Sequence, residues 1–284
     1  MFLKFTSEVG TLIFGADDMS TSFFRLTAAE GLSFPEKSFS AAVYANTRGQ
    51  KTVGTYVGPR TITLSGDVLL TQDTAHALSE AAHILDKPGT LEIHFDDRKP
   101  RKIDCSCSAF VPGERWGRYV LYVIQFICDD PYFYAAEETS VSAFGVEPLI
   151  NSSFTFPGVF SERTSRSTIY CEGSADTEPV FRIAVMDKNE SSSPEMNIKN
   201  HTTGSSIGLK YSAAVGDVIT IDTQKRKIYN QNGDNLLNFL NDDTFFDEFY
   251  LVPGENDIEV IVSGSVEAVR VECIYCARYI EAVV

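Results

Sequence analysis

The chain has 284 residues, of which 43% are apolar and 22% charged, a composition typical of a globular protein with room for one large or two ordinary domains. Its net charge of −15 argues against nucleic-acid binding, which requires clustered Lys and Arg. No apolar run is long enough to span a bilayer, and Lys4 and Glu8 interrupt the apolar N-terminal stretch. We therefore expect no membrane segment and no signal peptide.

Residues 36–58, "EKSFSAAVYANTRGQKTVGTYVG", are polar, dotted with Gly and only weakly periodic. A stretch of this length without its own compact structure is usually functional. We expect an extended hairpin or arm that reaches a neighbouring molecule.

The segments on either side of position 80 alternate apolar and polar residues with the period of a β-strand. One face of "TITLSGDVLL" (61–70) carries Ile62, Leu64, Val68 and Leu70, and one face of "TLEIHF" (90–95) carries Leu91, Ile93 and Phe95. Both segments are therefore expected to be strands with one buried face.

One helix is predicted between these strands, over residues 71–87. Its apolar positions recur at helical spacing, at Ala75, Leu78, Ala82 and Leu85. Thr71 or Asp73 is suited to cap its start, and Lys87-Pro88-Gly89 is suited to end it. A lone helix among strands indicates an α+β domain.

The segment "RYVLYVIQFIC" (118–128) is apolar on both faces. It is therefore expected to be a central strand or a strand that lies in a subunit interface. Asp129-Asp130-Pro131 ends it, and the connector that follows places the end of the first domain at residue 140.

The second half, residues 141–284, shows short strands separated by turn signals and no persuasive helix, which favours a β-sandwich. The strand segments are "PVFRIAV", "SIGLKY", "DVITID", "RKIYN", "FYLV", "DIEVIVSG" and "EAVRVECIY". In the last of them Val269, Val271, Cys273 and Tyr275 should face inward.

The six Cys residues are expected to be reduced thiols, because no export signal is present. Cys105 and Cys107 fall on one strand face with Ile103 and Ala109, where small buried groups belong. The C-x-x-C formed by Cys273 and Cys276 lies in a predicted strand, where the two sulfurs diverge. N-glycosylation sequons occur at Asn151, Asn189 and Asn200. They carry little weight as modification sites, because no secretion signal is present.

The stretch "GDVITIDTQKRKIYNQNGDN" (216–235) gathers carboxylate and amide side chains around a Gly. These side chains are Asp217, Asp222, Asn230, Asn232 and Asp234. The spacing and closing Glu of a calcium loop are missing, whereas Asn232-Gly233 is a strong tight-turn signal. We therefore interpret the stretch as two strands and their turns.

"GSSIG" (204–208) matches the nucleophile-elbow pattern, with Ser206 as nucleophile and His201 nearby. That motif needs a strand before it and a helix after it, and neither is predicted here, so a turn entering a strand is favoured. His76, His83, His94 and His201 show no zinc-ligand spacing. We predict no catalytic, cofactor-binding or metal-binding residues.

The order of these features resembles that of the distal tail (Dit) proteins of long-tailed, siphovirus-type phages. "GPRTITLSGDVLL", the helix, "GTLEIHFDDRKPRKIDC" and "FICDDPYF" are similar to the N-terminal domain of that family. "GDVITIDTQKRKIYNQNGDN", "FYLVPGENDIEVIVSG" and the last strand are similar to its C-terminal domain.

The resemblance implies a mainly β protein without enzymatic activity or cofactors. It implies an N-terminal α+β ring-forming domain, a β-sandwich or barrel with one helix, over residues 1–140. It implies a C-terminal galectin-like or jelly-roll sandwich over residues 141–284. Such proteins form hexameric rings at the phage tail tip, in the virion or encoded by a prophage. Their partners are the tail tube, a tail-associated hub or lysin protein, and receptor-binding or baseplate proteins.

One alternative function stays open from the residues. The sandwich could recognise a host-surface glycan through Tyr211, Tyr229 or Tyr250, although the single Trp, Trp116, lies in the first domain.

In the ring, the expected contacts are the doubly apolar strand, the arm 36–58 and the helix 71–87, because a cyclic ring needs two different patches on each subunit. An acidic lumen would let DNA pass without sticking.

Overall fold

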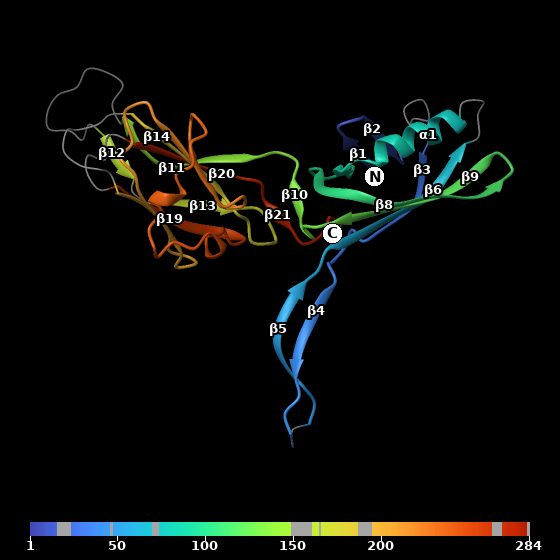
Figure 1. Ribbon diagram of the computed structural model, residues 1–284, viewed down its shortest axis with the longest axis horizontal. Coiled ribbons are helices and arrows are strands. Elements are labelled where there is room, and N and C mark those ends of the chain that lie inside the picture. The colour runs from blue at the N-terminus through green and yellow to red at the C-terminus, as the bar shows by residue number, and fades with distance from the viewer. Residues whose placement is uncertain are drawn as a thin grey trace. The chain divides into compact units, whose positions relative to one another are not determined.

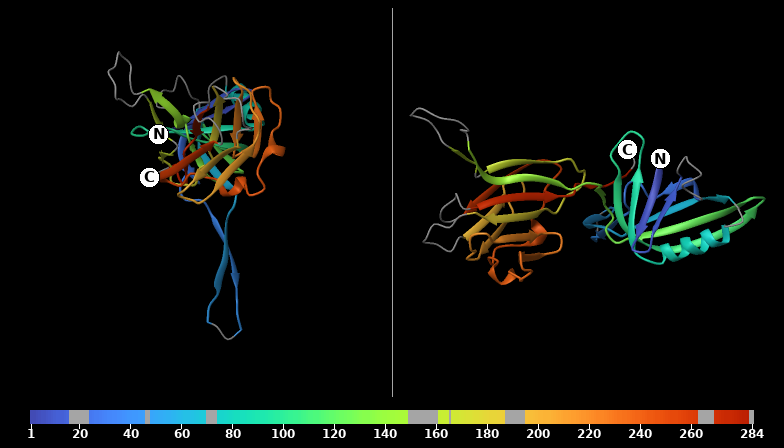
Figure 2. Two further views of the ribbon diagram at one scale, coloured as in Figure 1. Left: turned by 90° about the vertical axis from the view of Figure 1, so that its left-hand side faces the viewer. Right: turned by 90° about the horizontal axis from the view of Figure 1, so that it is seen from above.

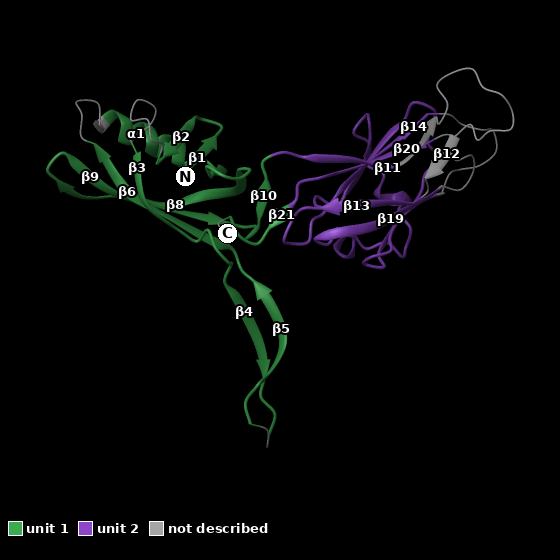
Figure 3. Cartoon of the chain, turned by 180° about the vertical axis from the view of Figure 1, so that it is seen from behind, with its two compact units in different colours: residues 1–136, 278–284 green, residues 137–277 purple. Residues whose placement is uncertain are grey.

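The computed structural model describes residues 1–15, 24–45, 48–69, 74–148, 161–164, 166–186, 195–262 and 269–282. The chain divides into two compact units (Figure 3). Unit 1 comprises Met1–Ala136 and Arg278–Val284, and unit 2 comprises Glu137–Ala277. The end of the chain, which the sequence placed in the second domain, thus returns to the first unit.

Unit 1 is built on a closed barrel of seven strands. The strands follow the order β8-β7-β1-β2-β3-β6-β9, and pairing of β9 back onto β8 closes the ring. Neighbours are antiparallel except β2 and β3, which pair in parallel at Phe14 and Phe24. The strands are β1 (Phe2–Ser7), β2 (Thr11–Phe14), β3 (Phe24–Glu30), β6 (Arg60–Leu69), β7 (Gly89–His94), β8 (Arg101–Trp116) and β9 (Tyr119–Cys128).

The barrel interior is filled by aromatic and branched side chains, as the alternation predicted for β6 and β7. Ile62, Leu64 and Val68 are fully buried, as are Leu91 and Ile93, whereas Phe95 is only half-buried and Leu70 lies outside the described residues. Aromatic rings complete the packing, with the rings of Phe24 and Tyr122 5.3 Å apart and those of Phe5 and Phe126 5.1 Å apart. Because burying each such side chain stabilises the fold by roughly 1.5–3 kcal/mol, this core accounts for the stability of unit 1.

The predicted arm is an exposed two-stranded hairpin. Strands β4 (Lys37–Ala42) and β5 (Lys51–Val57) pair with each other and belong to no other sheet in the described chain. Figure 1 shows the hairpin projecting from the barrel strands of its own unit. The hairpin part of this prediction is therefore confirmed, while contact with a neighbour stays a prediction.

The single α-helix, α1 (Thr74–Leu85), packs against β1, β2 and β8 of the barrel (Figure 2). Its buried side chains are Ala81, Ile84 and Leu85, with Leu78 half-buried. The predicted face was shifted by one residue, because Ala82 is exposed and Ala81 is buried instead. The proposed caps Thr71 and Asp73 lie outside the described residues. No helix in the described part of the chain is long and apolar enough to cross a membrane.

The last residues of the chain are bound to the barrel by hydrogen bonds from two arginines, Arg60 and Arg278. Strand β21 (Arg278–Tyr279) pairs with β10 (Phe133–Ala135), which continues the sheet from β8. Arg278 donates to the Asp130 carboxylate, which also accepts a hydrogen bond from Tyr134. The side chain of Arg60 is buried and donates to the carbonyl oxygen of Ile280 at 2.6 Å. The C-terminal segment is thereby part of the core of unit 1.

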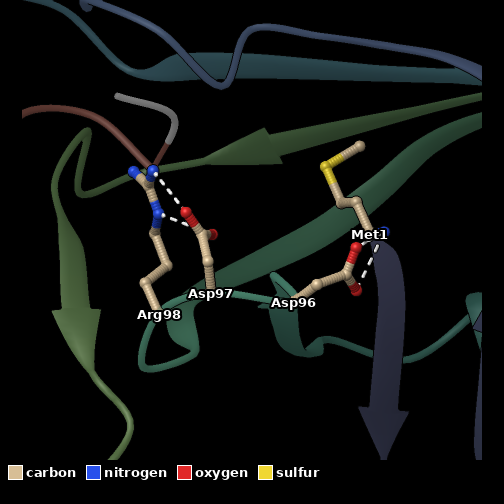
Figure 4. Close-up of polar contacts among 4 residues, drawn as sticks. All are labelled: Met1, Asp96, Asp97 and Arg98. Atoms are coloured by element: carbon tan, nitrogen blue, oxygen red, sulfur yellow. Dashed lines mark hydrogen bonds and ion pairs between the residues drawn. The ribbon is translucent and has the colours of Figure 1, made fainter.

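The first residue of the chain contacts the turn that joins β7 to β8 (Figure 4). The Met1 ammonium lies 3.4 Å from Asp96 Oδ2, and Arg98 Nε donates to Asp97 Oδ1 at 3.3 Å. The Arg98 guanidinium lowers the pKa of the Asp97 carboxyl. These exposed ion pairs add little to stability.

Unit 2 is a sandwich of two antiparallel sheets. One sheet has the order β12-β11-β20-β14-β17-β18 and the other β13-β19-β15-β16. The first contains β11 (Thr139–Pro148), β12 (Ser161–Thr164), β14 (Val180–Val185), β17 (Val218–Asp222), β18 (Lys227–Asn230) and β20 (Val269–Tyr275). The second contains β13 (Arg166–Cys171), β15 (Glu195–Asn200), β16 (Ser206–Lys210) and β19 (Gly254–Val262).

The two sheets meet through buried apolar side chains and through hydrogen bonds, one of which runs from Ser167 Oγ on β13 to the Ala143 carbonyl oxygen on β11. Tyr275 Oη on β20 donates to the carbonyl oxygen of Tyr170 on β13 at 2.7 Å. Val269, Val271, Cys273 and Tyr275 face inward as predicted. The mainly β fold with one helix and a C-terminal sandwich is thus confirmed.

One predicted strand of unit 2 is wrong. "FYLV" (249–252) forms only an isolated bridge, between Leu251 and Thr177. The segment before it holds two short 3₁₀ turns, η1 (Leu237–Phe239) and η2 (Phe246–Glu248). Its density of Asn and Asp favours such turns over a regular ladder.

Candidate assembly interface

The outer face of β9 carries a row of apolar side chains that remain exposed. Tyr119, Leu121, Val123 and Ile127 are 39–44% exposed, whereas the alternating residues Tyr122, Ile124 and Phe126 are buried in the barrel. This pattern explains why the segment is apolar on both faces. Only one face of β9 is covered within the chain. Of the two interpretations of residues 118–128, the fold therefore favours a strand that lies in a subunit interface.

Strand β8 extends this row. Val111 lies opposite Val123, and Trp116 lies opposite Tyr119. Both are exposed, Val111 at 54% and Trp116 at 67%. We call Val111, Trp116, Tyr119, Leu121, Val123 and Ile127 the outer-strand patch.

A register shift explains why the sequence did not reveal the β8 part of this patch. The pairing is irregular between Cys107 and Ala109, so that Ala109 lies opposite the exposed Gln125. Ala109 was predicted to share a face with Ile103, and the shift moves it to the outer face instead. A β-bulge of this kind reverses the alternation beyond it, and a second irregularity between Pro112 and Arg115 reverses it again, so that Val111 and Trp116 share the outer face. A signal for it was available in the loss of clean alternation through "SAFVPGERW".

The outer-strand patch has a polar border on β6. Thr63, Ser65 and Asp67 lie opposite Gln125, Val123 and Leu121 in the sheet. The Arg25 guanidinium pairs with Asp67 at 3.4 Å and lies 5.7 Å from the ring centre of Tyr119. An apolar centre with a polar rim is the usual composition of a protein interface.

The arm carries a second set of exposed apolar side chains. Phe39, Val43, Tyr44, Val53 and Tyr56 are 55–76% exposed, and we call them the arm patch. The register places Phe39 opposite Thr55 and Tyr56 opposite Ser38, so the aromatic rings project from both faces of the hairpin. An isolated hairpin is marginally stable in water, and packing against another surface would stabilise it.

The outer face of α1 is the least suited of the three predicted contact surfaces. Its exposed residues include His76, Ser79, Glu80 and His83, which are polar. His76 Nδ1 lies 3.9 Å from Glu80 Oε2, one turn along the same helix. Nothing comparable to the two apolar patches lies on this face.

The carboxylate and amide side chains of the stretch 216–235 form hydrogen bonds within turns. Asp217 accepts hydrogen bonds from the Ala214 amide at 2.7 Å and from Gln231 Nε2 at 2.8 Å. Asp222 accepts from the Lys225 amide at 2.8 Å. The interpretation of the stretch as strands and turns is therefore confirmed.

The second turn is organised by Asn230. Its Oδ1 accepts from the amides of Asn232 and Asp234, and its Nδ2 donates to Asp234 Oδ2. Gly233 has a φ of +85°, as the Asn-Gly signal predicted. In the described part of the chain, no group of three or more His, Cys, Asp or Glu is placed to bind a metal ion.

The structure does not bring Ser206 and His201 together as a catalytic pair. Ser206 begins β16 after a turn in which the Gly204 amide donates to the Asn200 carbonyl. His201 Nε2 instead lies 2.6 Å from Glu259 Oε2, and this contact lowers the pKa of the Glu259 carboxyl. "GSSIG" is thus a turn that enters a strand, as expected.

The other residues considered in the sequence analysis, the C-x-x-C cysteines, His94 and the sequon asparagines, are described by their burial and contacts. Cys273 is buried in β20 and Cys276 lies after the end of that strand. His94 stacks on Phe2 with ring centres 4.4 Å apart. Asn200 is fully buried, with its Nδ2 donating to the Tyr250 carbonyl oxygen. The sequons at Asn151 and Asn189 lie outside the described residues.

The tyrosines considered for glycan binding differ in exposure. Tyr229 is 37% exposed, and Tyr211 and Tyr250 are half-buried. The Tyr211 ring packs edge-on against Phe239, with centres 5.0 Å apart. Phe239 itself is 42% exposed.

Comparison with known proteins bears on both units. Residues 172–279 match the family described as "Siphovirus-type tail component, C-terminal domain". No curated protein sequence matches the chain. Among solved structures, the fold is similar to that of SPP1 Dit (gp 19.1), described as a paradigm of the hub adsorption apparatus in phages that infect Gram-positive bacteria. The TM-score is 0.71 at 14% identity, covering 98% of this chain and 99% of that one.

A second similar structure comes from the phage P2 baseplate in its activated conformation with Ca. Its TM-score is 0.51 at 11% identity, covering 96% of this chain and 97% of that one. The resemblance to distal tail proteins is thereby confirmed, and the match over residues 172–279 is to a component of phage tails. Residues 172–279 match the siphovirus-type tail component C-terminal domain family, and the chain as a whole has the fold of a distal tail protein.

Proposed function

We propose that six copies of this chain form a ring through unit 1 at the tip of a phage tail. In this ring the outer-strand patch of one subunit receives the arm patch of the next. Unit 2 provides attachment for receptor-binding or other baseplate proteins, and the ring joins them to the tail tube and a tail-associated hub or lysin protein. The chain acts as a scaffold in the virion and not as an enzyme.

The observation that carries this proposal is the presence of two different exposed apolar surfaces on one unit. A cyclic ring requires heterologous contacts, in which two distinct patches of each subunit meet their counterparts on its neighbours. The outer-strand patch and the arm patch meet this requirement because they lie on separate strands and differ in residue content.

Energetics favours using both surfaces in one contact. The β9 side chains are about half exposed, so covering them yields about 1 kcal/mol each, or about 6 kcal/mol for the six residues of the outer-strand patch. Association costs on the order of 4–15 kcal/mol in lost freedom. The patch alone is therefore marginal, and burying the more exposed arm patch against it supplies the remainder.

Charge supports a second copy of the chain as the occupant. Residues 36–58 contain Lys37, Arg48 and Lys51 against one acidic residue, Glu36. The arm therefore carries a net positive charge in a chain whose net charge is −15. The arm is thereby attracted to the acidic remainder of another copy, a long-range effect that accelerates association.

Native mass spectrometry and negative-stain imaging of the purified chain test the ring. We expect a six-fold particle of about 188 kDa, six times the 31.4 kDa subunit. Leu121→Ser with Val123→Ser, and separately Phe39→Ser with Tyr56→Ser, should each give monomers of unchanged circular dichroism.

Mixing the two double variants distinguishes heterologous from symmetric contacts. One variant keeps its arm and the other keeps its outer-strand patch, so each pair can form a single contact and a dimer is expected. Phe245→Ser, at a 60% exposed position in unit 2, serves as the control and should form rings. A wild-type chain that stays monomeric at its highest soluble concentration, or a patch variant that still forms rings, contradicts the proposal.

A second candidate function is glycan recognition by unit 2. The exposed Phe239, packed on Tyr211, favours it because aromatic rings stack on sugar faces. A glycan array probed with the whole chain tests it. Specific binding that Phe239→Ala abolishes and Trp116→Ala preserves would support this function, while an array without binding would leave the scaffold role alone.

A further inference from the structure

Two cysteines face each other across the pairing that closes the barrel. Strands β8 and β9 pair at Ser106 and Ile127 and then at Cys107 and Phe126. One step in the other direction, the antiparallel register brings Cys105 opposite Cys128. Directly opposed residues in antiparallel strands have Cα atoms about 4.5–5.5 Å apart, which falls within the range that a disulfide spans.

Both cysteines are held in place from their other sides as well. Cys105 also lies opposite Gly89 on β7, and Cys128 lies opposite Arg60 on β6. Cys105 is 5% exposed and Cys128 is fully buried. The four strands therefore fix the backbone on both sides of the pair, so that neither cysteine has to move far to meet the other.

The two thiols are in contact. A hydrogen bond between the Cys105 and Cys128 side chains, together with burial, raises the pKa of Cys105. Such a pair stays protonated at neutral pH and reacts slowly, because the thiolate is the nucleophile. The thiols are consequently stable where the surroundings are reducing and reactive only on longer exposure to an oxidant.

A cavity lies on the outer face of the same two strands. It has a volume of about 440 Å³ and is lined by residues 104–106 of β8 together with Ile127 and Asp129 of β9, whose exposed side chains alternate with the inward-facing Cys105 and Cys128. The acidic lining disfavours anionic oxidants such as oxidised glutathione, and a small neutral peroxide has no such penalty.

We propose that Cys105 and Cys128 form a cross-strand disulfide when the protein meets a small neutral peroxide, and that this bond closes the barrel covalently. The Cys105 thiolate attacks one peroxide oxygen, which gives a sulfenic acid and releases water after protonation. The Cys128 thiolate then attacks Cys105 Sγ and expels the hydroxyl as a second water. Two thiols and one hydrogen peroxide thus give one disulfide and two waters, with the peroxide reduced.

This inference does not depend on ring formation. Cytosolic thiols are kept reduced, whereas structural disulfides persist in oxidising surroundings. The disulfide would therefore form in chains that have left a reducing compartment, and it would lock the strand pairing on which the outer-strand patch lies.

The other buried pair of cysteines serves as an internal comparison. Cys171 lies on β13 and Cys273 on β20, which belong to opposite sheets of unit 2. These strands do not pair with each other, so no shared register sets the distance between the two cysteine backbones. Cys171 Sγ also lies 3.6 Å from Thr177 Oγ1. We expect this pair to remain as thiols.

The test is treatment of the whole purified chain with hydrogen peroxide, followed by denaturation, alkylation and peptide mapping. The expected product has lost two hydrogen atoms and contains a peptide that joins Cys105 to Cys128. Its formation should accelerate with rising pH, and dithiothreitol should reverse it. The thermal midpoint of unit 1 should rise by about 5–10 °C, because the bond constrains the unfolded chain.

Matched variants separate this pair from its neighbour. Cys107→Ala keeps both partners and should behave as the wild type, whereas Cys105→Ala and Cys128→Ala should lose the cross-link and the thermal shift. The wild-type peptide map stands by itself if either buried variant folds poorly. A sulfinic acid at Cys105 beside an alkylated Cys128, a disulfide between other cysteines, or unreacted thiols throughout would overturn the proposal.

Discussion

Replacing Arg60 with Met should unfold unit 1 at a markedly lower denaturant concentration. The Arg60 side chain is 4% exposed and lies over the Phe133 ring, 4.6 Å from its centre. Its nitrogens donate to four carbonyl oxygens from three separate parts of the chain. These belong to Gly31, Ser33, Pro131 and Ile280. Met retains the apolar stem and removes every donor.

The expected loss follows from the carbonyl groups left behind. A buried polar group that loses its partner costs about 1–3 kcal/mol. Four such groups would cost on the order of 4–12 kcal/mol, and relief from burying a charge, which already lowers the pKa of Arg60, offsets much of this. We expect a net loss of about 4 kcal/mol. Arg60→Lys keeps the charge but not the planar fork, and should lose about 2–3 kcal/mol.

Urea unfolding followed by circular dichroism measures the loss, and hydrogen exchange localises it. The Ala282 amide donates to the Leu32 carbonyl oxygen at 2.9 Å, so its exchange reports whether the C-terminal segment stays docked. Arg25→Met is the control, because Arg25 is half exposed, and its ion pair with Asp67 and its contact with the Tyr119 ring are each worth at most about 1 kcal/mol at an exposed site. If Arg60→Met cost no more than Arg25→Met, the assignment of Arg60 as the anchor would be wrong.

Three further substitutions test other parts of the fold. Gly66→Ala should cost about 1–3 kcal/mol in urea unfolding, because its Cβ would lie 1.9 Å from the Arg25 carbonyl oxygen, while Gly54→Ala, whose Cβ meets nothing closer than 4.0 Å, should be near neutral. Asn256→Ala should lower the thermal midpoint of unit 2 and cost about 2–3 kcal/mol, since the buried amide donates to the carbonyl oxygens of residues 252 and 254. Glu259→Gln should flatten the acid side of the stability-versus-pH curve: the lowered pKa of this carboxyl means that its contribution is present above the ordinary glutamate pKa and is lost as pH falls through the lowered value. An unchanged acid limb in Glu259→Gln would contradict this assignment.

Local periodicity predicted which faces of the strands are buried but not which strands pair. The alternation of residues 61–70 correctly identified Ile62, Leu64 and Val68 as core. Two pairings illustrate this limit, the parallel contact of Phe14 with Phe24 and the closure of β9 onto β8. The alternation of apolar and polar residues in these strands does not distinguish one pairing partner from another. Such pairings are decided by long-range packing, which a single sequence does not display.

The errors at individual residues have local physical causes. Ala82 and Ala81 are equally apolar, so small residues did not define the orientation of α1, and Ile84 of the buried face contacts the turn at Gly10. Ala109 was misplaced because a bulge breaks the period of two. The return of residues 278–282 to unit 1 depends on Arg60, whose four acceptors are backbone groups without any signature in the sequence.

The closed barrel restricts how unit 1 can bind a partner. Closure pairs most strand edges of the barrel, but β7 pairs with β8 only over residues 101–105, so one edge of β8 beyond Cys105 is left open. The barrel face that is apolar rather than polar is that of β9 with the end of β8, and association through side chains would use this face. The arm retains free strand edges as well as exposed rings, because β4 and β5 pair only with each other in the described chain. A contact that joins the barrel face to the arm combines these two complementary properties, whereas a contact between two barrel faces would leave the arm exposed. This difference is the physical reason to expect a directional contact, and therefore a ring, rather than a symmetric dimer.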